Sequence, residues 1–149
     1  MAPHSGVAGA PRWVGARSHQ WPDTEYVMGW DVLEEGLGVI FDPVIPGFVA
    51  ERIRGPIEAF TKGAAVDAYA LHPGGAKVLE AFESALGLDP TALAASKAVL
   101  REYGNMSSPT VLFVLKRILD GARRPGRVLA SALGPGFSCE SALLESASE

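Results

Sequence analysis

The pattern of apolar residues in the first third of the chain favours β-strands. Two β-leaning runs, 25–36 and 37–43, meet at Gly36, so the pattern predicts a hairpin there. A shorter run at 12–18 has strand character as well. The sequence therefore predicts three strands before the first helix.

The pattern changes to helical spacing at Pro46-Gly47. Between 46 and 63, apolar residues recur three or four positions apart, as they do on one face of a helix. Gly55-Pro56 is expected to kink or interrupt this helix, because proline has no amide hydrogen to donate. An apolar run at 65–72 then predicts a short buried strand that ends on His72.

Three more helices are predicted in the second half of the chain, at 74–88, 89–104 and 107–121. Asp89 and Pro90 are typical of an N-cap and a first helical position, and Ser107 or Ser108 is the expected cap of the last helix. That last helix is apolar on every side from Val111 to Leu115, which predicts burial on all sides rather than at a surface.

The chain closes with two predicted strands, 127–133 and 137–145, joined by a turn at Gly134-Pro135-Gly136. The order of strands, helix, strand, helices and closing hairpin indicates a layered α/β body. One sheet covered on two faces does not bury a helix on all sides. The pattern therefore indicates that a further layer of structure, outside this chain, covers the other side of the helix.

The totals describe a soluble globular protein of one domain. The chain has 149 residues, of which 48% are apolar and 20% charged, with a net charge of −4. The negative charge argues against a nucleic acid or an anionic membrane as partner, and no apolar run reaches the length of a transmembrane helix. Residues 1–11 are expected to be a flexible lead-in to a domain at 12–149. They lack the features of a signal peptide, so a cytoplasmic location is expected.

Two polar residues stand in tight turns just before predicted helices. His72 opens the motif HPGG, and Asn105 lies in GNMSS. Such a pair is suited to donating hydrogen bonds to a reacting carbonyl, a task that normally accompanies a nucleophile. The single cysteine, Cys139, lies in the last strand without a helix N-terminus to lower its pKa, so we do not expect it to be that nucleophile.

Structural roles are the alternative for each of these residues. A histidine at a strand end is usually structural or solvated, an asparagine before a helix is most often a cap, and glycines can simply permit a turn. His4 and His19 have no partner pattern. The cluster of Arg123, Arg124 and Arg127 fits a solvated loop better than a phosphate site.

The motifs HPGG, LREYGNMSSPTVLFVL and ALGPGFSCESALLE, in this order and spacing, resemble the C-terminal half of type III polyketide synthases, the chalcone/stilbene synthase family. The resemblance covers roughly residues 12–145. It implies half of a thiolase-like α/β fold, with a mixed sheet, helices on both faces and one central helix that the complete enzyme buries between two sheets. It also implies a homodimer, and a nucleophilic cysteine in an N-terminal half to which no residue here corresponds.

The family's reaction is decarboxylative Claisen condensation of malonyl-CoA onto an acyl group, which comes from an acyl-CoA starter and is held as a cysteine thioester. The resemblance implies that His72 and Asn105 are the catalytic histidine and asparagine, which stabilise the enolate and the tetrahedral oxyanion. It implies no metal and no cofactor, since the coenzyme A thioesters are substrates.

Eight further residues correspond to family positions near substrate or coenzyme A: Trp30, Val39, Gly74, Gly75, Ser107, Gly134, Pro135 and Gly136. The two glycines after His72 would allow close approach of the coenzyme A arm, and the turn at 134–136 would shape the cyclisation pocket. Val39 stands where plant chalcone synthases have a gatekeeping phenylalanine, and Trp30 where they have glycine. These departures favour a bacterial alkylpyrone or alkylresorcinol type of product over one from an aromatic starter.

Two other functions are compatible with the sequence. A ketoacyl-ACP synthase of fatty-acid initiation shares the fold and the catalytic residue types, but its usual His-Gln-Ala-Asn and Gly-Asn-Thr-Ser signatures differ from HPGG and GNMSS. A truncated or split gene would give a non-catalytic half-domain or an assembly partner. The family resemblance predicts that His72 and Asn105 face a common space at one end of the sheet. It also predicts that the helix after Asn105 is only partly covered within this chain.

Overall fold

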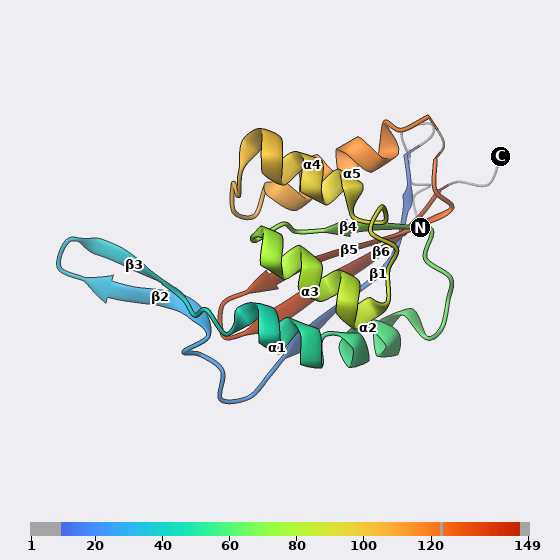
Figure 1. Ribbon diagram of the computed structural model, residues 1–149. Coiled ribbons are helices and arrows are strands. Elements are labelled where there is room, and N and C mark those ends of the chain that lie inside the picture. Colours follow the sequence, from blue (N-terminus) through green and yellow to red (C-terminus); the bar gives the residue numbers. More distant parts are fainter. Residues whose placement is uncertain (1–9, 123, 147–149) are drawn as a thin grey trace, which may run out of the picture.

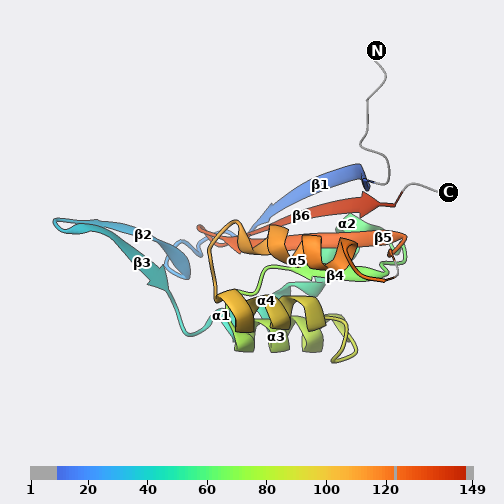
Figure 2. The ribbon, with the colours of Figure 1, turned by 90° about the horizontal axis from the view of Figure 1, so that it is seen from above.

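A four-stranded mixed sheet forms the centre of the molecule. The computed structural model describes residues 10–122 and 124–146. The strands are β1 (Arg12–Gln20), β2 (Met28–Leu33), β3 (Gly36–Phe41), β4 (Ala68–Leu71), β5 (Arg127–Gly134) and β6 (Ser138–Glu145). In the main sheet the order is β1-β6-β5-β4; β4 runs parallel to β5, and the other two pairs are antiparallel. Strands β2 and β3 form the predicted hairpin, which projects from the body (Figures 1 and 2).

Helices lie on both faces of this sheet. They are α1 (Ile45–Arg52), α2 (Arg54–Thr61), α3 (Ala76–Leu86), α4 (Ala94–Tyr103) and α5 (Thr110–Leu119). Side chains at odd positions of the sheet, such as Leu71 and Leu129, pack with α1, α2 and α3. Side chains at even positions, such as Ala70 and Val128, pack with Val114 of α5 on the other face. Helix α4 lies along β4 at the edge of the sheet (Figure 1). This is the expected α/β arrangement.

The helix expected at 46–63 is interrupted, as Gly55-Pro56 predicted. It divides into α1 and α2 at Ile53, one turn before Pro56, whose missing amide hydrogen leaves a gap in the helical hydrogen bonds. The start of α4, by contrast, differs from the prediction. The expected N-cap at Asp89 is wrong: its carboxylate Oδ1 accepts bonds from the Thr91 amide at 2.8 Å and hydroxyl at 2.6 Å. This local turn delays the start of α4 to Ala94.

The start of α5 also differs from the prediction. Neither Ser107 nor Ser108 caps it with a side chain. The Thr110 hydroxyl takes part instead, accepting from the Met106 amide at 2.8 Å and donating to the Ser107 carbonyl at 2.7 Å. Ser107 adopts a left-handed backbone conformation, with φ of 64°. A buried threonine therefore secures the turn that precedes this helix.

Helix α5 is covered on one side only. Val114 is completely buried against the sheet, whereas Leu112 is 63% exposed and Phe113 43% exposed. The ring of Phe113 contacts that of Tyr103, which is itself exposed. Burial of α5 on all sides is thus not found within this chain, and the expectation of partial coverage is confirmed. Among the described residues, no helix has the length and hydropathy needed to cross a lipid bilayer.

Candidate active site

The carboxyl end of β4 positions His72 through main-chain bonds. The His72 amide donates to the Ser131 carbonyl at 2.8 Å, which extends the pairing of β4 with β5 by one residue. The buried Ser96 hydroxyl of α4 donates to the Leu71 carbonyl at 2.8 Å. The Gly74 amide then turns back to the His72 carbonyl at 3.0 Å. Hydrogen bonds from β5 and α4 therefore fix the end of β4 that carries the imidazole.

Asn105 lies in the connection between α4 and α5 and reaches the same turn. Its Oδ1 atom accepts from the Ser107 amide at 2.9 Å, which sets the orientation of the side-chain amide. Its Nδ2 atom donates to the Gly74 carbonyl at 3.3 Å, leaving a second N–H on the same nitrogen for another acceptor. His72 and Asn105 both line one cavity at this end of the sheet. The two residues therefore border a common space, as expected.

This cavity has a volume of about 390 Å³ and combines the polar pair with an apolar wall. Five other predicted residues line it: Trp30, Val39, Ser107, Gly134 and Pro135. Gly74 lines a smaller hollow beside it. Gly75 and Gly136 line neither cavity. The Gly75 carbonyl accepts from the Val78 and Leu79 amides of α3, and the Gly136 amide donates to the Met28 carbonyl.

One face of the hairpin supplies most of the apolar wall. The register pairs Met28 with Phe41, Trp30 with Val39, and Val32 with Leu37, so that this face is apolar along its whole length. Met28 and Phe41 line the cavity but were not among the predicted site residues, although their alternate spacing with Trp30 and Val39 was a usable signal. Trp30 is 55% exposed and Val39 62% exposed, so the cavity is open on the hairpin side.

Burial shapes the acid–base behaviour of His72. The ring is half-buried, and its Nδ1 atom is buried with no hydrogen-bond partner among the described residues. Burial lowers the pKa of the imidazole, because the charged form loses hydration. At neutral pH His72 is therefore a neutral ring that can donate one hydrogen bond.

We expect the His72 ring to titrate below the usual range for histidine. The folded chain then binds fewer protons at His72 than the unfolded chain does. The free energy of unfolding is therefore unaffected by protonation of His72 above the ordinary pKa of 6.5. It decreases as the pH falls from 6.5 through the lowered pKa of the folded chain. An acid titration of the ring by NMR measures the midpoint, and His72→Gln should flatten the fall in stability over that range. A midpoint at or above the ordinary value would contradict the effect of burial.

Cys139 lies away from the cavity, on the face of the sheet that packs with α1, α2 and α3. It is 1% exposed, and its thiol contacts the hydroxyls of Ser131 and Ser141. Burial raises the pKa of the Cys139 thiol, so it is not a thiolate at neutral pH.

The other two histidines lie away from the cavity or outside the described residues. His19 of β1 packs against Trp21, and His4 lies outside the described residues. Within residues 10–122 and 124–146, no group of three or more potential ligand side chains is placed to hold a metal ion.

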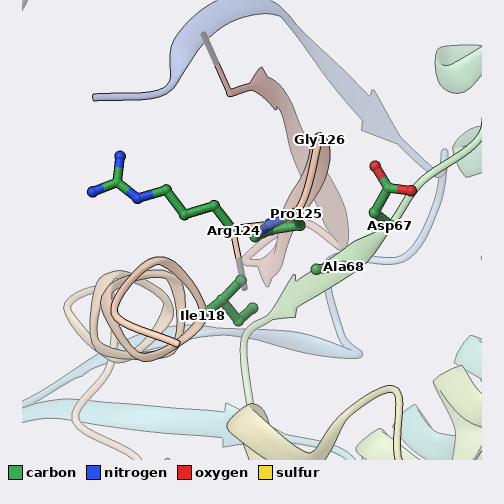
Figure 3. Close-up of a pocket in the computed structure, with 6 residues that line it drawn as sticks. All are labelled: Asp67, Ala68, Ile118, Arg124, Pro125 and Gly126. Atoms are coloured by element: carbon green, nitrogen blue, oxygen red, sulfur yellow. The ribbon is translucent and has the colours of Figure 1, made fainter. Parts of the chain in front are cut away.

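The second large cavity is at the opposite end of β4 and lacks comparable chemistry. It measures about 520 Å³, and Figure 3 shows the Arg124 side chain extending away from Asp67. The expectation of a solvated loop is wrong for Arg127, which begins β5 and donates from Nε to the Glu145 carboxylate at 3.0 Å. Its Nη2 atom contacts the same oxygen. Arg123 lies outside the described residues.

Residues 14–148 match the family model of the C-terminal domain of chalcone and stilbene synthases. The chain belongs to this family. It is 39% identical over 144 residues to 1,3,6,8-tetrahydroxynaphthalene synthase of Streptomyces peucetius subsp. caesius, covering 92% of this chain and 38% of that enzyme. Its relatives are type III polyketide synthases, and it corresponds to their C-terminal half.

Solved structures of the family have the same fold. The crystal structure of PKS-I from the brown alga Ectocarpus siliculosus superposes with a TM-score of 0.87 at 28% identity, covering 97% of this chain and 41% of that chain. CsyB complexed with CoA-SH superposes with a TM-score of 0.83 at 26% identity, over 92% of this chain and 41% of that chain. The fold of this chain is therefore thiolase-like, and it spans about two-fifths of the length of these family members.

Proposed function

We propose that this chain supplies the histidine and asparagine of a type III polyketide synthase active site. The observation that carries the proposal is the placement of His72 and Asn105 in one cavity, with Asn105 anchored to the turn that follows His72. The reaction would be decarboxylative condensation of malonyl-CoA onto an acyl thioester. This reaction would need no metal or cofactor, since the coenzyme A thioesters are substrates. CsyB, with a similar structure, was crystallised with CoA-SH.

Two steps of this reaction place negative charge on a carbonyl oxygen. Malonyl-CoA first loses carbon dioxide, and the electron pair of the broken C–C bond forms an enolate. The enolate carbon then attacks the acyl thioester, and the tetrahedral oxyanion collapses with loss of the cysteine thiolate. The free N–H of Asn105 and the N–H of the His72 ring would stabilise both anions by donating hydrogen bonds. The Asn105 amide has no proton acidic enough to quench the enolate.

The nucleophilic cysteine must come from the part of a type III polyketide synthase that this chain does not span. Cys139 is buried and not acidic, so it cannot hold the acyl group. We propose that this other part covers the exposed apolar faces of α5 and of the β2–β3 hairpin, and so closes the cavity. We also propose that the protein acts in the cytoplasm and that it forms a homodimer, as the family resemblance implies.

The cavity wall bears on the starter unit. Val39 is a small residue in the cavity lining, and its strand partner Trp30 supplies part of the apolar wall. A wide passage combined with a partly filled pocket suits an extended alkyl chain better than a bulky aromatic group. We therefore propose an aliphatic starter and an alkylpyrone or alkylresorcinol type of product.

A chimera tests the function. Residues 12–149 replace the matched C-terminal segment of the Streptomyces peucetius enzyme, and malonyl-CoA consumption is measured with an aliphatic acyl-CoA starter. We expect turnover by the chimera and none by the 149-residue chain alone, which would lack a thiolate. An inactive but folded chimera would favour the non-catalytic half-domain, and activity only with acyl carrier protein substrates would favour a ketoacyl-ACP synthase. Turnover by the chain alone, lost on Cys139→Ser, would overturn our account of Cys139.

A further inference from the structure

A single buried hydroxyl joins two segments of the chain behind the cavity wall. Thr24 is 5% exposed and lies in the turn that leads from β1 to the hairpin. Its single proton is shared between the Trp21 carbonyl at 2.6 Å and the Gly136 carbonyl at 3.1 Å, and its oxygen accepts from the Phe137 amide at 3.0 Å. Thr24 does not itself line the cavity.

The two segments that Thr24 joins continue directly into the cavity wall. The Gly136 amide donates to the carbonyl of Met28, the first residue of the hairpin, at 3.0 Å. Met28 lines the cavity, as does Pro135, which precedes Gly136 in the turn between β5 and β6. Displacing Gly136 would therefore move the hairpin base and the turn relative to each other.

Other contacts hold the turn as well: Phe137 is completely buried and stacks on Trp21, and its carbonyl accepts from the Trp21 amide at 3.2 Å. Gln20 Nε2 donates to the Gly136 carbonyl at 3.4 Å. Gly136 adds no side chain to this packing, and its φ of 104° would strain any residue other than glycine. The hairpin is a two-stranded ribbon away from the main sheet, an arrangement that is marginally stable by itself. Buried hydrogen bonds at its base therefore have a large share in setting its direction.

We propose that Thr24 is a positioning residue that fixes the spacing between the hairpin and the turn at 134–136, and so sets the room for the growing acyl chain. The part of this proposal that concerns the acyl chain rests on the proposed function. The Thr24 hydroxyl would act only through Met28, Pro135 and their neighbours, and would touch neither substrate nor the polar pair.

The first test uses amide hydrogen exchange in the 149-residue chain. Thr24→Val keeps the shape of the side chain and removes the hydroxyl, whereas Thr24→Ser keeps the hydroxyl. We expect exchange at Gly136 and Phe137 to accelerate about tenfold in the valine variant, with Phe82 in α3 unaffected, and the serine variant to resemble the original. Unchanged exchange at Gly136, or equal acceleration throughout the chain, would overturn the positioning role.

The second test compares products of the active chimera. We expect Thr24→Val to change the distribution of chain lengths while malonyl-CoA consumption stays within about twofold, and Thr24→Ser to restore the original distribution. Faster exchange at Gly136 with an unchanged distribution would refute the effect on the acyl chain. A chimera with Thr24 intact that makes no product would refute the proposed function instead, while the exchange measurement still decides whether Thr24 holds the wall.

Discussion

Replacing Asn105 by alanine should lower malonyl-CoA turnover of the chimera roughly 100- to 1,000-fold, the usual effect of removing one donor from an oxyanion site. Asn105→Ala removes the Nδ2 donor and also the bond to the Gly74 carbonyl. Asn105→Asp is the sharper variant. It keeps an oxygen that can accept from the Ser107 amide, but it places a negative charge where the enolate forms. We expect it to be at least as inactive as the alanine variant.

His72→Ala should have an effect of similar size, because the ring is the second donor that faces the cavity. His19→Ala is the matched control, since His19 of β1 packs on Trp21 and does not line the cavity. The measurement is the rate of malonyl-CoA consumption, with unfolding curves to show that each variant is folded. Wild-type rates in either the Asn105 or the His72 variant would contradict the catalytic assignment.

The sequence was sufficient for the fold because its local signals agree with the tertiary structure. The apolar runs, the hairpin at Gly36 and the turn at 134–136 all have residues that prefer the observed conformations, and the order of elements is as predicted. The boundaries were less certain. Asp89 followed by proline favours a helix cap and a local turn equally well, and only the bonds to Thr91 distinguish them.

The site could be predicted in part. His72 and Asn105 stand in short motifs, so their roles could be proposed before their positions were known. Thr24 has no such signal, because its partners Gly136 and Phe137 lie more than 110 positions further along the chain. A hydroxyl whose role depends on contacts of that sequence separation becomes visible only in the folded chain.

Helix α5 provides the second large expected effect. Leu112→Asp combined with Phe113→Asp should destabilise this chain only modestly, by about 1 kcal/mol, because Leu112 is 63% exposed and Phe113, which contacts Tyr103, is 43% exposed. Aspartate in the first turns of a helix also interacts favourably with the helix dipole. Docking should respond differently. If the rest of a type III polyketide synthase covers this face, two buried charges would replace two central apolar contacts and weaken binding by about 2 kcal/mol or more.

The measurement is the dissociation constant between this chain and the separately produced N-terminal portion of the Streptomyces peucetius enzyme. A loss of 2 kcal/mol corresponds to about a thirtyfold increase in that constant. Lys77→Asp on the exposed side of α3 is the matched control, because it changes the net charge by the same two units. An unchanged constant in the double variant would exclude α5 as the docking face. Equal weakening by Lys77→Asp would indicate a long-range charge effect, since the two substituted surfaces lie on opposite faces of the sheet.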